Sequence, residues 1–302
     1  MGKRKRKKIS LELTILALPC LTFLFFFNYL PLFGLLIPFK RLNFARGILG
    51  SEWVGLKNFE FFFRSQDALR VTRNTLLFNF AFIILGLVIA VTLALFLFEL
   101  PKTQVKIYQT AMFMPYFLSW IVVSYIVYAL VNPQMGLVPR FLQTLGFSPP
   151  NFYLEAKHWI YIFPIVSLWK GVGSNTLLYY AALMSIDTNQ FEAAAIDGAN
   201  KFQITFRISI PFLIPLITLL SILAIGGIFY SDFGMFFFLT KNSGPLYPVT
   251  DVIDTYVYRA LRVTGDVGMA SAMGLYQSVV GFILVLVSNL VVRKINPESG
   301  IF

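Results

Sequence analysis

Long runs of apolar residues, separated by short polar stretches, dominate the chain. A helix needs about 20 largely apolar residues to cross about 30 Å of hydrocarbon. Six runs reach that length, and they predict transmembrane helices over residues 13–39, 76–98, 107–131, 159–184, 210–233 and 271–292. Prolines bend or close several of them, because proline removes a helical hydrogen bond. The pattern predicts an all-α polytopic membrane protein with both termini on one side.

The loops on the side away from the termini carry weaker patterns of their own. Residues 53–63 are rich in aromatic side chains, which is typical of a helix at the membrane surface. Residues 138–145 and 252–261 predict two further short helices, each next to a stretch rich in turn-forming residues.

Composition supports the membrane assignment. Of 302 residues, 57% are hydrophobic and only 13% are charged, and the mean hydropathy is +0.73, whereas soluble domains are about one quarter charged. The net charge of +11 raises the question of a nucleic-acid partner. Six of the 25 lysines and arginines, however, lie within residues 3–8, just before the first run. Such a cluster is typical of a cytoplasmic anchor on anionic lipid, so we expect no nucleic-acid partner.

The chain is therefore divided into a basic cytoplasmic tail, residues 1–12, and a single transmembrane domain, residues 13–302. Basic residues outside the spans are equally distributed between the two sides. The first helix usually decides orientation, and its N-terminal flank is the more densely basic one. We expect both termini, and the connection over residues 187–209, in the cytoplasm of a bacterial cell.

That connection, DTNQFEAAAIDGANKFQITFRIS, is longer than a tight turn requires. Asp187 is expected to cap a helix over residues 188–197, with Gln190 as its partner in a capping box. Gly198 suits the left-handed conformation that often follows a helix.

A second helix is expected to begin at Asn200 or Lys201, with Phe202 and Phe206 on one face. Pro211 then marks the start of the fifth span. These features predict a helix–turn–helix that lies across the membrane surface. A narrow, alanine-rich helix suits docking into a groove of a soluble partner, but it equally suits an interfacial helix resting on its own bundle.

The segment EAAAIDGANKFQITFRISIPFLIP closely resembles the EAA motif of ABC-importer permease subunits. The resemblance extends over nearly the whole chain and points to the carbohydrate-uptake branch, particularly its oligosaccharide permeases. It is supported by WVGLKNF, by LWKGVG and by LTKNSGPLYPVTDVIDTYVYR. LTKNSGP departs from the family pattern, since many relatives have a Gly-Gly pair before the proline.

The resemblance implies a six-span core in which the EAA helix, called the coupling helix, sits in a cleft of a cytoplasmic ATPase. Carried over by position, it assigns ATPase docking to Glu192, Ala193, Ala194, Asp197 and Gly198. It also suggests a heterodimer with a second permease chain, a dimeric ATPase and an extracytoplasmic sugar-binding protein. The expected mechanism is alternating access driven by ATP.

The chain itself has no G-x-x-x-x-G-K-[ST] phosphate loop. We therefore expect a transport subunit rather than an enzyme, with ATP and magnesium held by the partner and with no cofactor or metal in this chain. His158 is the single histidine and is expected at a membrane interface.

Candidate residues of a substrate path are polar groups within the spans. Lys170 either faces a watery interior or extends towards the outer interface. Sugars require aromatic faces and hydrogen-bonding groups, which are also offered by Asn175, Tyr179, Tyr230, Asp232 and Gln277. The alternative function is an ion-coupled secondary transporter, but such proteins use ionisable groups near the midplane, whereas the acids here gather at span ends and in loops.

Overall fold

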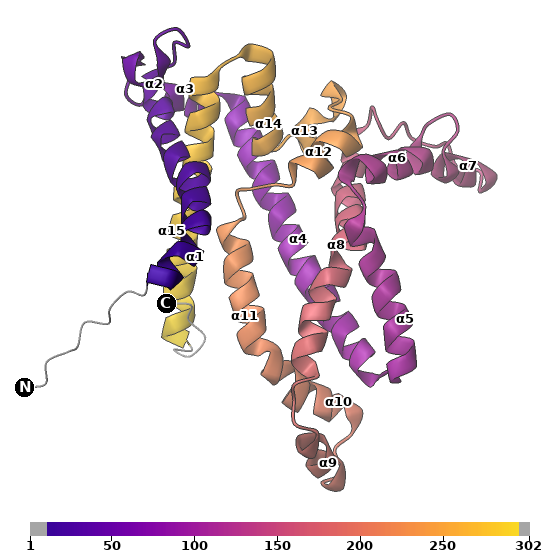
Figure 1. The fold of residues 1–302 in the computed structure, drawn as a ribbon. Helices are drawn as coiled ribbons and strands as arrows, with labels where there is room; N and C mark the ends of the chain where they lie inside the picture. The colour runs from indigo at the N-terminus through magenta and orange to yellow at the C-terminus, as the bar shows by residue number, and fades with distance from the viewer. Residues whose placement is uncertain (1–10, 296–302) are drawn as a thin grey trace, which may run out of the picture.

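The computed structural model describes residues 11–295, which are mostly helical (Figure 1). Helices long and apolar enough to cross a membrane are Thr14–Phe39, Gln66–Glu99, Lys201–Gly226 and Val267–Lys294. A bent pair, Lys102–Phe117 and Trp120–Val131, qualifies only when its two parts are taken together. The prediction of an all-α polytopic protein is confirmed, but six uninterrupted spans are not observed. The predicted basic anchor, residues 3–8, lies outside the described residues.

The first span consists of α1 (Leu11–Leu24), a π-helical turn (Phe25–Tyr29) and a 3₁₀ segment (Leu30–Phe39). Its last part packs against α15 (Val267–Ile295), beside which it is seen in Figure 1. The small loop helix α2 (Gly47–Gly50) follows it.

The predicted short helix near residues 53–63 is confirmed as α3 (Lys57–Arg64). A two-stranded antiparallel sheet, β1 (Lys40–Arg41) and β2 (Glu52–Trp53), precedes it. Asn58 of α3 donates hydrogen bonds from Nδ2 to the carbonyls of Pro38 and Lys40, at 2.8 and 3.0 Å. The end of the first span is thereby joined to this loop.

The longest helix is α4 (Gln66–Glu99), which packs along α8 (Trp159–Leu183). It begins ten residues before the predicted span, because other parts of the protein form hydrogen bonds with the polar side chains of its first turns. Asn74 Nδ2 donates to the carbonyl of Asp251 at 3.0 Å, and Thr75 Oγ1 accepts from the amide of Ile253 at 2.9 Å.

The third predicted span, residues 107–131, is wrong as a single straight helix. α5 (Lys102–Phe113) and the turn after it meet α6 (Trp120–Val131) at a bend of 100°. Pro115 lacks an amide proton, and Ser119 adopts an extended conformation in which its side chain caps the amide of Val122. This turn between α5 and α6 is called the elbow below.

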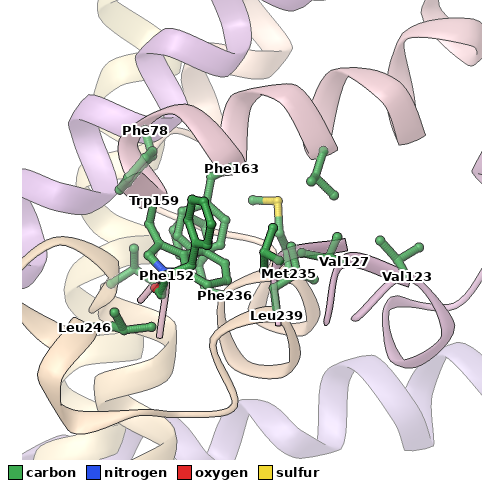
Figure 2. Close-up of a cluster of buried hydrophobic side chains, with 13 residues drawn as sticks. Phe78, Val123, Val127, Phe152, Trp159, Phe163, Met235, Phe236, Leu239 and Leu246 are labelled. Carbon is green, nitrogen blue, oxygen red and sulfur yellow. Dashed lines mark hydrogen bonds between the residues drawn. The ribbon is translucent and has the colours of Figure 1, made fainter. Parts of the chain in front are cut away.

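The largest buried cluster joins the elements on the upper side of Figure 1 (Figure 2). It contains Phe78 of α4, Trp159 and Phe163 of α8, and Phe236 of α12 (Phe233–Thr240). The rings of Phe163 and Phe236 lie 4.4 Å apart between centroids, and such aromatic pairs contribute about 0.5–1.5 kcal/mol beyond their buried area.

Three short helices complete this side. The predicted helices near residues 138–145 and 252–261 are confirmed as α7 (Leu137–Thr144) and α14 (Ile253–Arg259). α13 (Tyr247–Thr250) lies between α12 and α14.

A buried carboxylate, Asp251, joins this layer to α4. Its two oxygens each lie 2.6 Å from Nη2 of Arg259, and Oδ2 lies 3.2 Å from Nη2 of Arg70. Thr255 donates to Oδ1 at 2.9 Å. The Asp251 side chain is fully buried, and a buried charge is tolerated only when it is paired in this way.

We predict that Asp251→Asn destabilises the protein by about 3–5 kcal/mol, because it leaves two arginines without their shared counter-charge. Thermal unfolding of the purified chain in detergent measures this. Glu60→Gln, which breaks the exposed pair with Arg64, is the matched control and should leave the midpoint nearly unchanged. Equal midpoints for both variants would contradict the role given to Asp251.

Candidate functional site

The predicted coupling connection folds around α9 (Thr188–Ile196), which forms the lower tip of the molecule in Figure 1. Asp187 caps it as predicted, but its carboxylate accepts from the amide of Asn189 at 3.0 Å, and no side-chain bond to Gln190 is seen there. The capping box lies instead at Asn200, where Asn200 and Gln203 exchange two side-chain-to-amide bonds of 2.8 Å.

The turn after α9 depends on Gly198, whose φ of +77° confirms the predicted left-handed conformation. The amide of Ala199 donates back to the carbonyl of Ala194 at 2.9 Å, which closes the end of the helix. A side chain at Gly198 would meet no neighbouring atom, so the constraint is the backbone conformation itself.

The segment after the turn differs from the prediction. α10 (Lys201–Ile204) passes through a π-helical turn (Thr205–Ser209) directly into α11 (Ile210–Gly226). The expected separate surface helix ending at Pro211 is therefore wrong, and one helix runs from Lys201 to Gly226. The predicted face is confirmed, since the rings of Phe202 and Phe206 lie 4.4 Å apart.

The tip presents an uncovered surface with apolar and charged groups. Glu192, Ala193, Asp197 and Gly198 are exposed, and Ala194 is half-buried. Ile196 is 86% exposed and Phe202 71% exposed. A cavity of about 330 Å³ lies in the bend and is lined by Ala194, Asp197, Gly198, Ala199, Gln203, Ile204, Arg207 and Ile208. The predicted docking residues thus lie together on a surface that a partner can reach.

A second cavity, of about 350 Å³, lies between α4, α8 and α11. Two predicted path residues, Asn175 and Tyr179, line it. Sequence reasoning missed three other polar residues of its wall, Asn79, Ser167 and Ser221.

Asn79 forms hydrogen bonds with a stretch of non-helical backbone beside this cavity. α11 ends at Gly226, and the next residues continue without helical structure to α12. Asn79 Nδ2 donates to the carbonyls of Ile228 and Tyr230 at 2.8 and 3.1 Å. Non-helical backbone at membrane depth persists where it is buried in protein or lines a cavity, and Gly227 and Ile228 do line this one. In the sequence, an asparagine within the apolar run over residues 76–98 could have indicated this role.

Three other predicted path residues hold this irregular segment and do not line the cavity. Gln277 donates to the carbonyl of Phe229 at 2.6 Å, and the hydroxyls of Tyr230 and Ser278 lie 2.7 Å apart. Asp232 caps α12 through the amide of Met235 and accepts from Nε1 of Trp120 at 2.5 Å.

Lys170 also lies outside the cavity, at the elbow. Its Nζ donates to the carbonyl of Tyr116 at 2.9 Å and stands 5.5 Å from the Tyr116 ring centroid and 5.2 Å from that of Trp120. The amino group therefore interacts with the turn that breaks the third predicted span.

Asp254 of α14 also holds the segment after α11. Its Oδ2 accepts from the amide of Ser231 at 2.7 Å. Burial raises the pKa of the Asp254 carboxyl, although hydrogen bonds from Ser231 and Gln277 oppose the shift. Because the folded state binds this proton more tightly than the unfolded state does, the charged carboxylate reduces stability at neutral pH and protonation restores it.

We predict that Asp254→Asn removes one pH-dependent contribution to stability. In the parent, this contribution rises as the pH falls from 7 through the raised pKa of Asp254. The variant should gain less thermal stability, or lose more, than the parent between pH 7 and about pH 3.5, which lies below the ordinary pKa of an aspartate. Identical pH dependence of the two unfolding midpoints would contradict the assignment.

The chain is similar in sequence to several known proteins. Residues 105–297 match the family model described as binding-protein-dependent transport system inner membrane component. Protein LplB of Bacillus subtilis is 33% identical over 303 residues, which cover 100% of this chain and 93% of LplB. The polygalacturonan/rhamnogalacturonan transport system permease protein YteP of the same organism is 30% identical, covering 99% and 95%. The sn-glycerol-3-phosphate permease protein UgpA of Yersinia enterocolitica is 32% identical, covering 79% and 78%.

Solved structures are similar as well. A chain of a bacterial ABC transporter involved in the import of the acidic polysaccharide alginate gives a TM-score of 0.87 at 29% identity, covering 94% of this chain and 96% of that one. A chain of a bacterial alginate ABC transporter, in complex with alginate pentasaccharide-bound periplasmic protein, gives a TM-score of 0.85 at 28% identity, with 94% of each chain covered.

Proposed function

We propose that this chain, which belongs to the family of binding-protein-dependent transport system inner membrane components, forms half of the translocation path of an ABC importer for a sugar or oligosaccharide. One observation carries the proposal. A single helix, Lys201–Gly226, begins beside the exposed tip and ends at the polar-walled cavity. A partner that moves the tip therefore acts directly on the wall of the path.

The tip is proposed to dock a cytoplasmic ATPase dimer, which supplies the ATP and magnesium chemistry. Glu192, Ala193, Ala194, Asp197 and Gly198 are the proposed docking residues, with the exposed Ile196 beside them as an apolar anchor. Large exposed apolar side chains on a charged surface are typical of a protein interface. The proposed motion is alternating access, in which closure of the ATPase dimer rocks the helices around the cavity.

The proposed membrane topology follows from the same geometry. In Figure 1 the connection between α4 and α5 and the C-terminal end of α15 lie towards the α9 side of the molecule. We place this side, and both termini, in the cytoplasm of a bacterial cell. The opposite side, with α3, α7 and α12–α14, then faces the extracytoplasmic sugar-binding protein, and a second permease chain completes the path.

A carbohydrate substrate is supported by relatives that are named for polygalacturonan, rhamnogalacturonan and alginate transport. The wall of the cavity offers the hydrogen-bonding groups and the aromatic ring that carbohydrates need, in Ser167, Asn175, Tyr179 and Ser221. An ion-coupled secondary transporter, the alternative function, is set aside because the chain belongs to a family of binding-protein-dependent transport components.

We predict that Ile196→Asp abolishes co-purification of the ATPase in mild detergent, because it places a charge where an apolar contact should form. Leu145→Asp, at a 55% exposed position on the opposite side, is the control and should retain the ATPase. If both variants retain it equally, Ile196 does not belong to the docking surface.

We predict that Gly198→Val reduces ATP-driven sugar uptake at least tenfold while the complex still assembles, because a β-branched residue strongly disfavours φ near +77°. Gly198→Asn should retain most uptake, since asparagine tolerates the left-handed conformation. Uptake into proteoliposomes with ATP inside or outside also tests the proposed function itself. Transport that needs an ion gradient and no ATP would overturn it.

A further inference from the structure

We infer that Gly86 and Gly171 set the size limit of the substrate path, at a subsite for a single sugar ring. The inference rests on the proposed function and names the residues that decide how bulky a ring can pass. Both glycines line the cavity of about 350 Å³ between α4, α8 and α11. Gly86 lies inside α4 and Gly171 inside α8, away from the ends of these helices.

Helix formation alone does not favour glycine at these two positions. Within a helix, glycine loses more backbone entropy on folding than alanine does. Neither residue is among the glycines with a positive φ in the described part of the chain. A left-handed backbone, which glycine adopts most easily, therefore does not account for either of them.

Close helix packing, the usual reason for a glycine in a transmembrane helix, does not account for them either. Gly173, two residues from Gly171, is a packing glycine, because a Cβ there would collide with the carbonyl of Met112. A Cβ at Gly86 or Gly171 would meet no heavy atom within 4 Å beyond its own stretch of helix. Inside this chain, the missing side chains leave free only the space of the cavity.

Polar groups without a protein partner in the same wall point independently to a ligand. Tyr179 is only 4% exposed and lines the cavity, yet its hydroxyl has no hydrogen-bond partner among the described residues. The side chains of Ser167, Asn175 and Ser221 also line the cavity, and no described residue forms a hydrogen bond with them. Because a buried hydroxyl without a partner is costly, a ligand rich in hydroxyl groups complements this wall.

The cavity has the size for one sugar ring. Its volume of about 350 Å³ is near the lower end of the range for ligand pockets, about 300–1,000 Å³. None of the described residues that line it is charged, so the wall selects by size and hydrogen bonding. One methylene group changes binding in a filled pocket by about tenfold or more. A ring with bulky substituents is therefore the substrate that a methyl group at Gly86 or Gly171 affects most.

A purely structural role for the two glycines would be to let a helix of the second permease approach closely. The two roles differ in measurable respects. A side chain that blocks a packing contact weakens the assembly and reduces transport of all sugars alike. A side chain that narrows the cavity leaves the assembly intact and reduces transport of bulky rings selectively.

The test uses the complete complex, reconstituted in proteoliposomes with its second permease, ATPase and binding protein. The probes are short oligosaccharides from hydrolysed pectin and hydrolysed starch, each with bare rings and with partly acetylated rings. Mass spectrometry measures the initial rate of ATP-dependent uptake of each. We expect Gly86→Ala and Gly171→Ala to lower the ratio of acetylated to bare uptake about tenfold. The unchanged binding protein contributes equally to parent and variant. Gly171→Leu, which fills more of the cavity, should also lower uptake of bare rings at least tenfold.

Gly274→Ala is the matched control. Gly274 lies inside α15, and a Cβ there would likewise meet no heavy atom within 4 Å beyond its own stretch of helix. Gly274 does not line the cavity, so its substitution should leave the uptake ratio unchanged. Since alanine is the better helix former, all three alanine variants should keep or raise the thermal midpoint and should still co-purify with the second permease.

The outcomes separate the size limit from the proposed function. The size limit is overturned, and the importer function left intact, if the alanine variants lower uptake of bare and acetylated rings equally or release the second permease. Full uptake of bare rings by Gly171→Leu overturns it as well. Absence of ATP-dependent uptake of any sugar by the parent complex overturns the proposed function itself.

Discussion

Hydrocarbon offers no hydrogen-bonding partner to a backbone amide or carbonyl, and this constraint governs the structure. Where helices are continuous the constraint is met automatically. The chain is irregular at two places, at the elbow between α5 and α6 and after Gly226, and in both places a side chain donates hydrogen bonds to the backbone. Lys170 donates to the carbonyl of Tyr116, and Asn79 donates to the carbonyls of Ile228 and Tyr230. Asn79 also lines the cavity between α4, α8 and α11, whereas Lys170 does not.

The sequence predicted the class of fold because hydropathy reports directly on the length of apolar helices. It also predicted the Gly198 turn and the Phe202–Phe206 face, both of which depend on local geometry alone. It missed the elbow, since residues 107–131 are uniformly apolar and Pro115 alone does not specify a bend of 100°. It also missed the union of α10 with α11, because Pro211 predicted the start of a new helix, whereas one helix continues through a π-helical turn and past this proline.

Among the predicted path residues, too, some predictions agree with the structure and others do not. Asn175 and Tyr179 were identifiable as polar groups on one span, and they line the cavity. Tyr230, Asp232 and Gln277 have similar chemistry, yet their bonds go to neighbouring backbone and side chains. Arg259 lies eight residues from Asp251 in the sequence, but Arg70 lies 181 residues away, and only the fold brings it to the carboxylate. An ion pair between residues so far apart in the sequence produces no local sequence pattern that could predict it.

The continuous helix Lys201–Gly226 has a mechanical consequence. At 1.5 Å per residue, its 26 residues span about 39 Å. A rod of that length turns a tilt of about five degrees at the end beside α9 into a sideways shift of roughly 3 Å at the other. That shift is comparable to the width of a hydroxyl group, so in the proposed mechanism a small movement of the docked ATPase is geometrically sufficient to widen or narrow the cavity at the far end of the helix.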